Sequence, residues 1–137
     1  MWWMYALLSA VFAALTAVFA KMGIKGVDSD LATAIRTVVI LVLAWSIILV
    51  KGSLGTVTDL SKTNWTFLLL SGVATGLSWI FYFKALQLGK VSQVAPVDKA
   101  SVAIAILLSV VFLGEALTLK TAIGAGLIIA GTLVLIA

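Results

Sequence analysis

The chain has 137 residues, of which 64% are hydrophobic and 10% are charged, and its formal net charge is +4. Its mean hydropathy of +1.27 excludes a water-soluble globular domain, which needs a far more polar surface. The basic residues are scattered, which argues against a nucleic-acid partner, and the lack of Cys and His removes disulfides and any plausible zinc ligand set, so we expect no metal and no cofactor.

Five apolar stretches fill almost all of the chain. A bilayer core about 30 Å thick is crossed by roughly 20 helical residues, and each stretch is close to that length. A helix pairs its own backbone N–H and C=O groups, as lipid requires, and the alternation of a membrane β-barrel is absent. We predict an all-α integral membrane protein, a bundle of five transmembrane helices forming one domain over residues 1–137. The expected helices are residues 2–20, 31–50, 64–88, 92–113 and 119–136.

The first two stretches are joined by a short polar turn. The first begins with aromatic residues that suit the membrane–water interface, and it closes at Lys21. The turn offers Asp28, Ser29 or Asp30 as the cap of the second helix. Arg36 lies about 8 Å inside that helix at 1.5 Å per residue, and at this depth it is a candidate for charge balance or for holding an anionic substrate.

The third stretch ends in a dense aromatic run from Trp79 to Phe83. Aromatic side chains can line a pocket for apolar or cationic substrates, and they also form the belts found at membrane interfaces. The belt is the favoured interpretation for the run as a whole, for Phe83 first and also for Tyr82. Trp79 lies deeper and is the better pocket candidate, and we place Tyr82 beside it as a second one.

The fourth stretch carries the sharpest local signal, the adjacent charges Asp98 and Lys99. Pro96 precedes them and predicts a bend, because it removes one helix hydrogen bond. Three interpretations remain open: a substrate or coupling-ion site, a static ion pair between Arg36 and Asp98, and an interfacial position for both charges. In the first interpretation Asp98 carries the coupling proton and Lys99 balances charge.

Small residues mark two further segments. Glycines in helices allow close approach of a neighbouring helix, within one subunit or between two. A strict G-x-x-x-G lies in the third stretch and a looser cluster in the fifth. The expected packing positions are Gly72, Gly76, Gly124, Gly126 and Gly131.

An odd number of spans puts the two termini on opposite sides of the membrane. One face then holds Lys21, Lys25, Lys84 and Lys90, and the other holds fewer basic residues. The positive-inside rule favours the N-terminus outside and the C-terminus inside. The margin is small enough to suit a chain that inserts in both orientations.

With these residues placed, the chain resembles one EamA-type domain of the drug/metabolite transporter superfamily. The resemblance lies in Lys21, in Arg36, in Leu77-Ser-Trp-Ile-Phe-Tyr-Phe-Lys-Ala-Leu86 and in Phe112-Leu-Gly-Glu-Ala-Leu-Thr118, followed by the glycine-rich last helix. It implies transport of small organic solutes, often export, across a bacterial or archaeal plasma membrane. It also implies that this chain is one half of a ten-helix inverted-repeat fold, completed by an antiparallel homodimer.

Two departures qualify what the resemblance implies. The related small multidrug-resistance exporters carry a Glu in their first helix, whereas residues 2–20 here contain no acid. The pair Asp98–Lys99 also stands where many such domains are apolar or hydroxylated. No catalytic set is present, so we expect a transporter working by alternating access and not an enzyme. The alternatives are a non-transporting assembly subunit of the membrane and a flippase for lipid-linked substrates.

Overall fold

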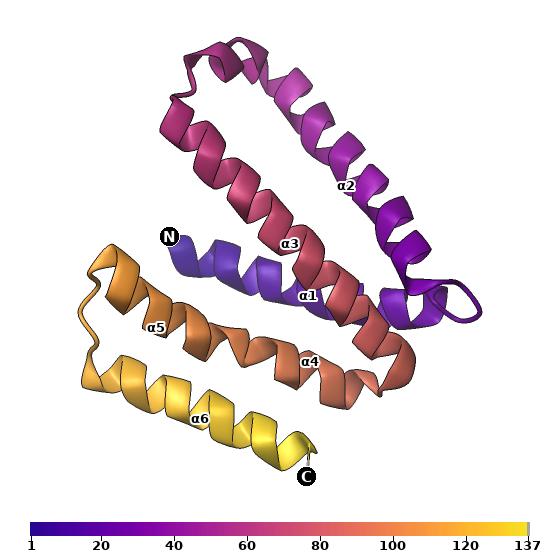
Figure 1. Ribbon diagram of the computed structural model, residues 1–137, viewed down its shortest axis with the longest axis vertical. Coiled ribbons are helices and arrows are strands. Elements are labelled where there is room, and N and C mark those ends of the chain that lie inside the picture. The colour runs from indigo at the N-terminus through magenta and orange to yellow at the C-terminus, as the bar shows by residue number, and fades with distance from the viewer. Residues whose placement is uncertain (137) are drawn as a thin grey trace. The chain divides into compact units, whose positions relative to one another are not determined.

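The computed structural model describes residues 1–136, and these are helical along almost their whole length (Figure 1). Within them, five segments are long and apolar enough to cross a membrane, and none of these residues forms a strand. The predicted all-α membrane fold with five spans is therefore confirmed, while the inverted pairing of two copies stays a prediction. The helices are α1 (Trp2–Gly23), α2 (Ser29–Lys51), η1 (Ser53–Asp59), α3 (Lys62–Leu88), α4 (Val91–Lys99), α5 (Ser101–Leu113) and α6 (Leu119–Ile136).

Polar caps explain why two helices begin before the predicted apolar stretches. The Oδ1 atom of Asp28 accepts hydrogen bonds from the backbone N–H groups of Asp30 and Leu31, both at 3.0 Å, so α2 begins at Ser29. These bonds satisfy two donors that a helix N-terminus otherwise leaves open. The Ser61 hydroxyl does the same for the N–H of Asn64 at 3.1 Å.

The fourth span, Val91–Leu113, keeps helical backbone angles throughout, with φ −60° and ψ −20° at Ala100, and its hydrogen-bond ladder is interrupted there. It consists of α4 and α5, which meet at Ala100. The N–H of Ala100 donates to the carbonyl of Val97, three residues back, at 3.0 Å. In a regular helix that N–H would bond to Pro96, four residues back. The interruption thus lies one turn beyond the proline and leaves the Pro96 carbonyl for another donor.

The described chain divides into two compact units. From the sequence, the short connections between spans predict a single compact bundle. The α4–α6 unit contains Met1–Phe19 and the chain from Leu88 onward, and the α2–α3 unit contains Ala20–Gln87. In the first, α6 packs against both α4 and α5 (Figure 1). Lipid is as apolar as a leucine side chain, so little free energy drives these helices to bury more of each other's surface.

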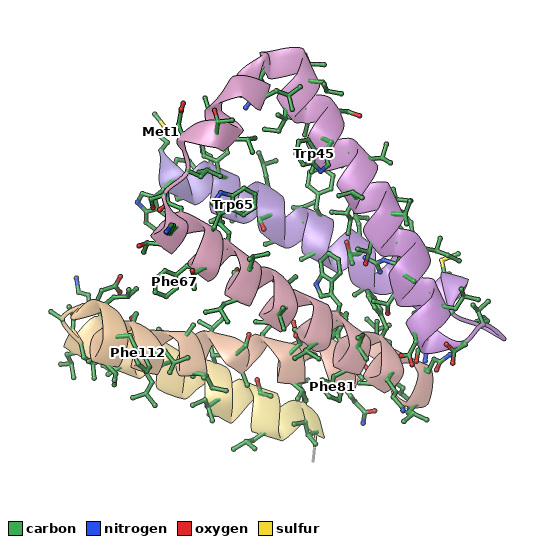
Figure 2. The ribbon with its side chains drawn as sticks, turned by 45° about the horizontal axis from the view of Figure 1, so that its top comes forward. Met1, Trp45, Trp65, Phe67, Phe81 and Phe112 are labelled. Carbon is green, nitrogen blue, oxygen red and sulfur yellow. The ribbon has the colours of Figure 1, made fainter. Side chains whose placement is uncertain are left out.

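Few side chains are buried within the chain itself. Phe83 and Leu86 are the largest fully buried side chains among the described residues. Most large apolar side chains are exposed, and Figure 2 labels several of them, including Phe67, Phe81 and Phe112. Such surface is unsuited to water and well suited to hydrocarbon or to another apolar helix.

Candidate functional site

The last three turns of α3 present one stripe of side chains toward the rest of the α2–α3 unit. Trp79, Tyr82, Phe83 and Leu86 share a helix face because they are spaced by three or four residues. Phe83 is 1% exposed and Leu86 is 0% exposed, and Trp79 and Tyr82 are half-buried. Phe81, on another face, is 68% exposed. The aromatic run therefore divides into an inward stripe and an outward remainder.

Arg36 of α2 lies on this stripe. Its guanidinium carbon is 4.2 Å from the centroid of the Phe83 ring, a cation–π contact. The Tyr82 ring meets the Phe83 ring edge-on, with centroids 5.5 Å apart and planes inclined by 66°. Tyr82 is also an electrostatic neighbour of Arg36. The structure thus brings together two of the predicted substrate residues, Arg36 and Tyr82.

The predicted interfacial position of Phe83 is wrong. A belt side chain faces lipid headgroups, whereas this ring is enclosed beneath the guanidinium. Composition alone does not reveal which face of a helix an aromatic residue occupies, and the positions of α2 and α3 decide it here. Phe83 is the site residue that sequence reasoning missed, and its spacing of four from Trp79 was the available signal.

Within its unit, the Arg36 guanidinium makes no hydrogen bond or ion pair among the described residues. Counted from Ser29, it lies about 10 Å along α2 at 1.5 Å per residue. A guanidinium carries five N–H donors in one plane, and stacking on a ring occupies a face and not those edges. The donors are therefore available to a ligand.

Two side chains join the end of α3 to the turn between α1 and α2. The ammonium of Lys21 donates to the carbonyl of Leu86, and the side-chain amide of Gln87 donates to the carbonyl of Val27. The last four carbonyls of a helix have no partner within it, and a cation there also complements the helix dipole. Lys21 thus stabilises the position of the stripe that holds Phe83.

An open hollow of about 240 Å³ lies beside these contacts, and we call it the basic hollow. Gly26 forms part of its wall in a left-handed conformation, φ 73°, that other residues adopt only with strain. The ammonium groups of Lys21 and Lys25, which are four residues apart in the sequence, give the hollow a positive lining. Its lining residues are Lys21, Ile24, Lys25, Gly26 and Gln87.

The charges of the fourth span lie in the other unit, at the end of α4. The ammonium of Lys99 is 3.3 Å from Oδ2 of Asp98, and the two side chains are 59% and 34% exposed. They immediately precede the interruption at Ala100. The partner of Asp98 within its unit is thus its own neighbour, and the alternative pair with Arg36 stays a prediction.

The predicted packing glycines have open space around them. A Cβ atom added to any of the five would meet no heavy atom within 4 Å among the described residues, outside its own helix backbone. The contacts of α6 with α4 and α5 therefore proceed without close backbone approach at these glycines. Their role in helix packing stays a prediction. The positions are Gly72, Gly76, Gly124, Gly126 and Gly131.

Comparisons with known proteins cover the whole chain. The EamA-like transporter family matches residues 1–137. A protein of a Sinorhizobium species described as "Uncharacterized transporter in cobO 3'region" is 49% identical over 134 residues, which are 98% of this chain and 95% of that protein. No solved structure gives a significant match.

Proposed function

The chain belongs to the EamA-like transporter family, and from this premise we propose that it is a secondary transporter exporting small organic metabolites or drugs by alternating access. Family membership and five apolar helices make it a multi-pass membrane transporter. The direction, the class of cargo and the mechanism are the proposal. A relative from a bacterium supports the plasma membrane of a bacterium as its location.

The interrupted fourth span is the observation that carries the proposal. The backbone at Ala100 keeps right-handed helical angles, φ −60° and ψ −20°, so the interruption is a local change in the helix hydrogen bonds, from four residues back to three, beside the two charges. In many transporters broken helices provide the substrate and coupling-ion sites. Here the break at Ala100 directly follows Asp98 and Lys99. Charged residues inside a span are costly, which supports a functional role for the pair.

Asp98 is the proposed coupling residue. As a carboxylate it pairs with the Lys99 ammonium at 3.3 Å, and protonation of the carboxylate removes this ion pair. The two protonation states therefore favour different local arrangements at the break. A ligand shifts a conformational equilibrium only if it binds the two states with different affinities. A proton on Asp98 meets this condition, because it binds more tightly to the arrangement in which the ion pair with Lys99 is not formed. Trp79 and Tyr82 are the proposed pocket residues.

An antiparallel homodimer is the proposed working unit. One five-helix chain corresponds to one half of an inverted-repeat transporter, and the substrate site of that architecture lies between its two halves. Exposed apolar faces and the open space at Gly72 and Gly76 support a partner helix there. A second copy in the opposite orientation supplies the missing half, and the weak charge asymmetry of the chain permits both insertions.

The test is efflux from proteoliposomes preloaded with a panel of radiolabelled small metabolites under an imposed pH gradient. We expect faster efflux of at least one solute than from protein-free vesicles. Asp98→Asn should abolish its dependence on the gradient. The matched control is Asp59→Asn, because Asp59 is an exposed acid in η1 and lies outside the spans. Gradient-driven efflux that persists in Asp98→Asn contradicts the coupling role.

A further inference from the structure

We propose that the Arg36 guanidinium, seated on the Phe83 ring, binds the oxyanion of the cargo, so that the transported solutes are organic anions with a carboxylate or phosphate group. This inference rests on the proposed transport function and names its substrate class. It is carried by the placement of one cation inside a span without an anionic partner in its unit.

The first argument is the charge that remains to be neutralised. A charge within a span normally faces a partner or a water-filled path. The acids of the α2–α3 unit are engaged or remote. Asp28 accepts two backbone hydrogen bonds as the cap of α2, Asp30 is exposed in the first turn, and Asp59 lies in η1 beyond the other end of α2. A bound anion would supply the counter-charge that the acids of this unit do not provide.

The second argument is the geometry of the donors. The Arg36 guanidinium carbon lies over the Phe83 ring, 4.2 Å from its centroid, and this contact uses none of the five N–H donors in a hydrogen bond to oxygen or nitrogen. The N–H edges of a guanidinium match the paired oxygens of a carboxylate or phosphate, which accept two parallel hydrogen bonds. The ring itself is 1% exposed and contacts the Tyr82 ring edge-on. The cation is therefore held in place before a ligand arrives, which reduces the entropy lost on binding.

The third argument is the electrostatic surroundings. The basic hollow lies in the same unit and carries the ammonium groups of Lys21 and Lys25. Lys21 is already bonded to the carbonyl of Leu86, whereas its charge still contributes to the local potential. A cleft lined by one sign of charge raises the local concentration of the opposite ion. The hollow thus favours the approach of anions to the side of the membrane from which α2 begins.

The experiment measures binding separately from transport. The protein is reconstituted in nanodiscs of phosphatidylcholine and titrated calorimetrically with benzoate and with phenyl phosphate. Benzamide, a neutral molecule of nearly the same shape as benzoate, and benzylammonium serve as comparison ligands. We expect saturable binding of the two anions and at least about tenfold weaker binding of the other two, because only the anions satisfy the guanidinium edges.

Two variants of Arg36 link this selectivity to the site. Arg36→Gln should remove the preference for benzoate over benzamide, and Arg36→Lys should weaken benzoate binding about tenfold because an ammonium lacks the paired donors. The matched control is Lys51→Gln, a basic residue at the opposite end of the same helix, which should bind as the natural protein does. If Arg36→Gln does not fold, as judged by helical circular dichroism, Arg36→Lys and Phe83→Leu carry the test.

The anion can come from a lipid headgroup or from a soluble solute, and a second titration separates the two sources. In nanodiscs containing phosphatidylglycerol, loss of benzoate binding identifies a lipid phosphate as the occupant, whereas unchanged binding identifies the soluble anion. Both results keep an oxyanion site at Arg36, but only unchanged binding supports the cargo as its occupant, and loss of binding overturns that assignment.

Other outcomes overturn one proposal without the other. Equal binding of benzoate and benzamide, or anion binding that is unaffected in both Arg36 variants, overturns the anion site. Efflux of neutral solutes that Arg36→Gln leaves intact also overturns it and keeps the transport function. Anion-selective binding without efflux of any solute of the metabolite panel keeps the site and contradicts the transport function.

Discussion

The hydroxyl of Thr132 in α6 donates to the main-chain carbonyl of Pro96 in α4 across 3.1 Å. That carbonyl is available because the N–H of Ala100 bonds to Val97 instead. The Thr132 oxygen is also 2.8 Å from the carbonyl of Ile128, so one hydroxyl hydrogen serves two acceptors. At 8% exposure, Thr132 is the buried polar residue of α6 among those described. A side chain of one helix thus satisfies the backbone opened by the break in another.

We expect Thr132→Val to loosen α6 from α4. Valine has nearly the same shape and lacks the hydroxyl, so the variant removes the hydrogen bond to Pro96 and little else. Interhelical hydrogen bonds in membranes contribute about 0.6 kcal/mol on average, and the free energy of unfolding in detergent should fall by about that amount. Reversible unfolding followed by circular dichroism measures it.

Thr75→Val is the control for this prediction. Its hydroxyl donates to Ser71 within α3 at 2.8 Å, as that of Thr132 does to Ile128, and it is exposed. The control should leave stability nearly unchanged. Equal losses in the two variants would show that the contact with Pro96 contributes nothing.

Pro96→Ala should straighten the fourth span and raise its stability. Alanine restores a backbone donor and removes the ring that crowds the preceding turn, a defect that costs about 3 kcal/mol in the interior of a soluble helix. The free energy of unfolding should rise by about 1 kcal/mol, because the membrane and Thr132 already compensate part of the defect. Efflux should slow, since the break carries the proposed coupling residue.

Ser101→Ala, in the first turn of α5, is the matched change that leaves the break in place. We expect it to alter neither stability nor efflux appreciably. Should Pro96→Ala transport at the natural rate with raised stability, the break would be a structural feature and no part of the transport cycle.

The number of spans and the capping turn before α2 could be predicted from the sequence for simple reasons. Spanning lipid demands length and apolarity, which are local properties, and the Asp28 cap uses residues within three positions. The place of the break could not be predicted, because it lies one turn beyond Pro96 and its freed carbonyl is satisfied by Thr132, 36 residues away.

The candidate site was predictable in its members and not in its geometry. Arg36 and Tyr82 stand out as a charge inside a span and an aromatic residue near its end. Their proximity depends on how the α1–α2 turn is attached to the end of α3, which involves the bonds of Lys21 to Leu86 and of Gln87 to Val27. These contacts join residues 60 or more positions apart, and no local sequence pattern predicts them.

Lys21→Met should lower the stability of the α2–α3 unit by about 1 kcal/mol, because the carbonyl of Leu86 loses its charged donor at the end of a helix. Methionine keeps most of the apolar stem, so packing is largely retained. Hydrogen exchange of the last turn of α3 should accelerate. Lys84→Met, an exposed lysine in the same helix, is the control and should show natural exchange.

Single introduced cysteines test the antiparallel pairing, because the natural chain has no cysteine and any labelling reports the new one. Lys90→Cys lies between α3 and α4, and Thr58→Cys lies in η1, at opposite ends of α3. A membrane-impermeant maleimide applied to intact cells should label about half of the protein in each variant, because a balanced chain inserts in both orientations. Complete labelling of one variant and none of the other means a single orientation. In that case the chain completes its fold with a parallel copy or a different protein, and the proposed inverted homodimer is wrong.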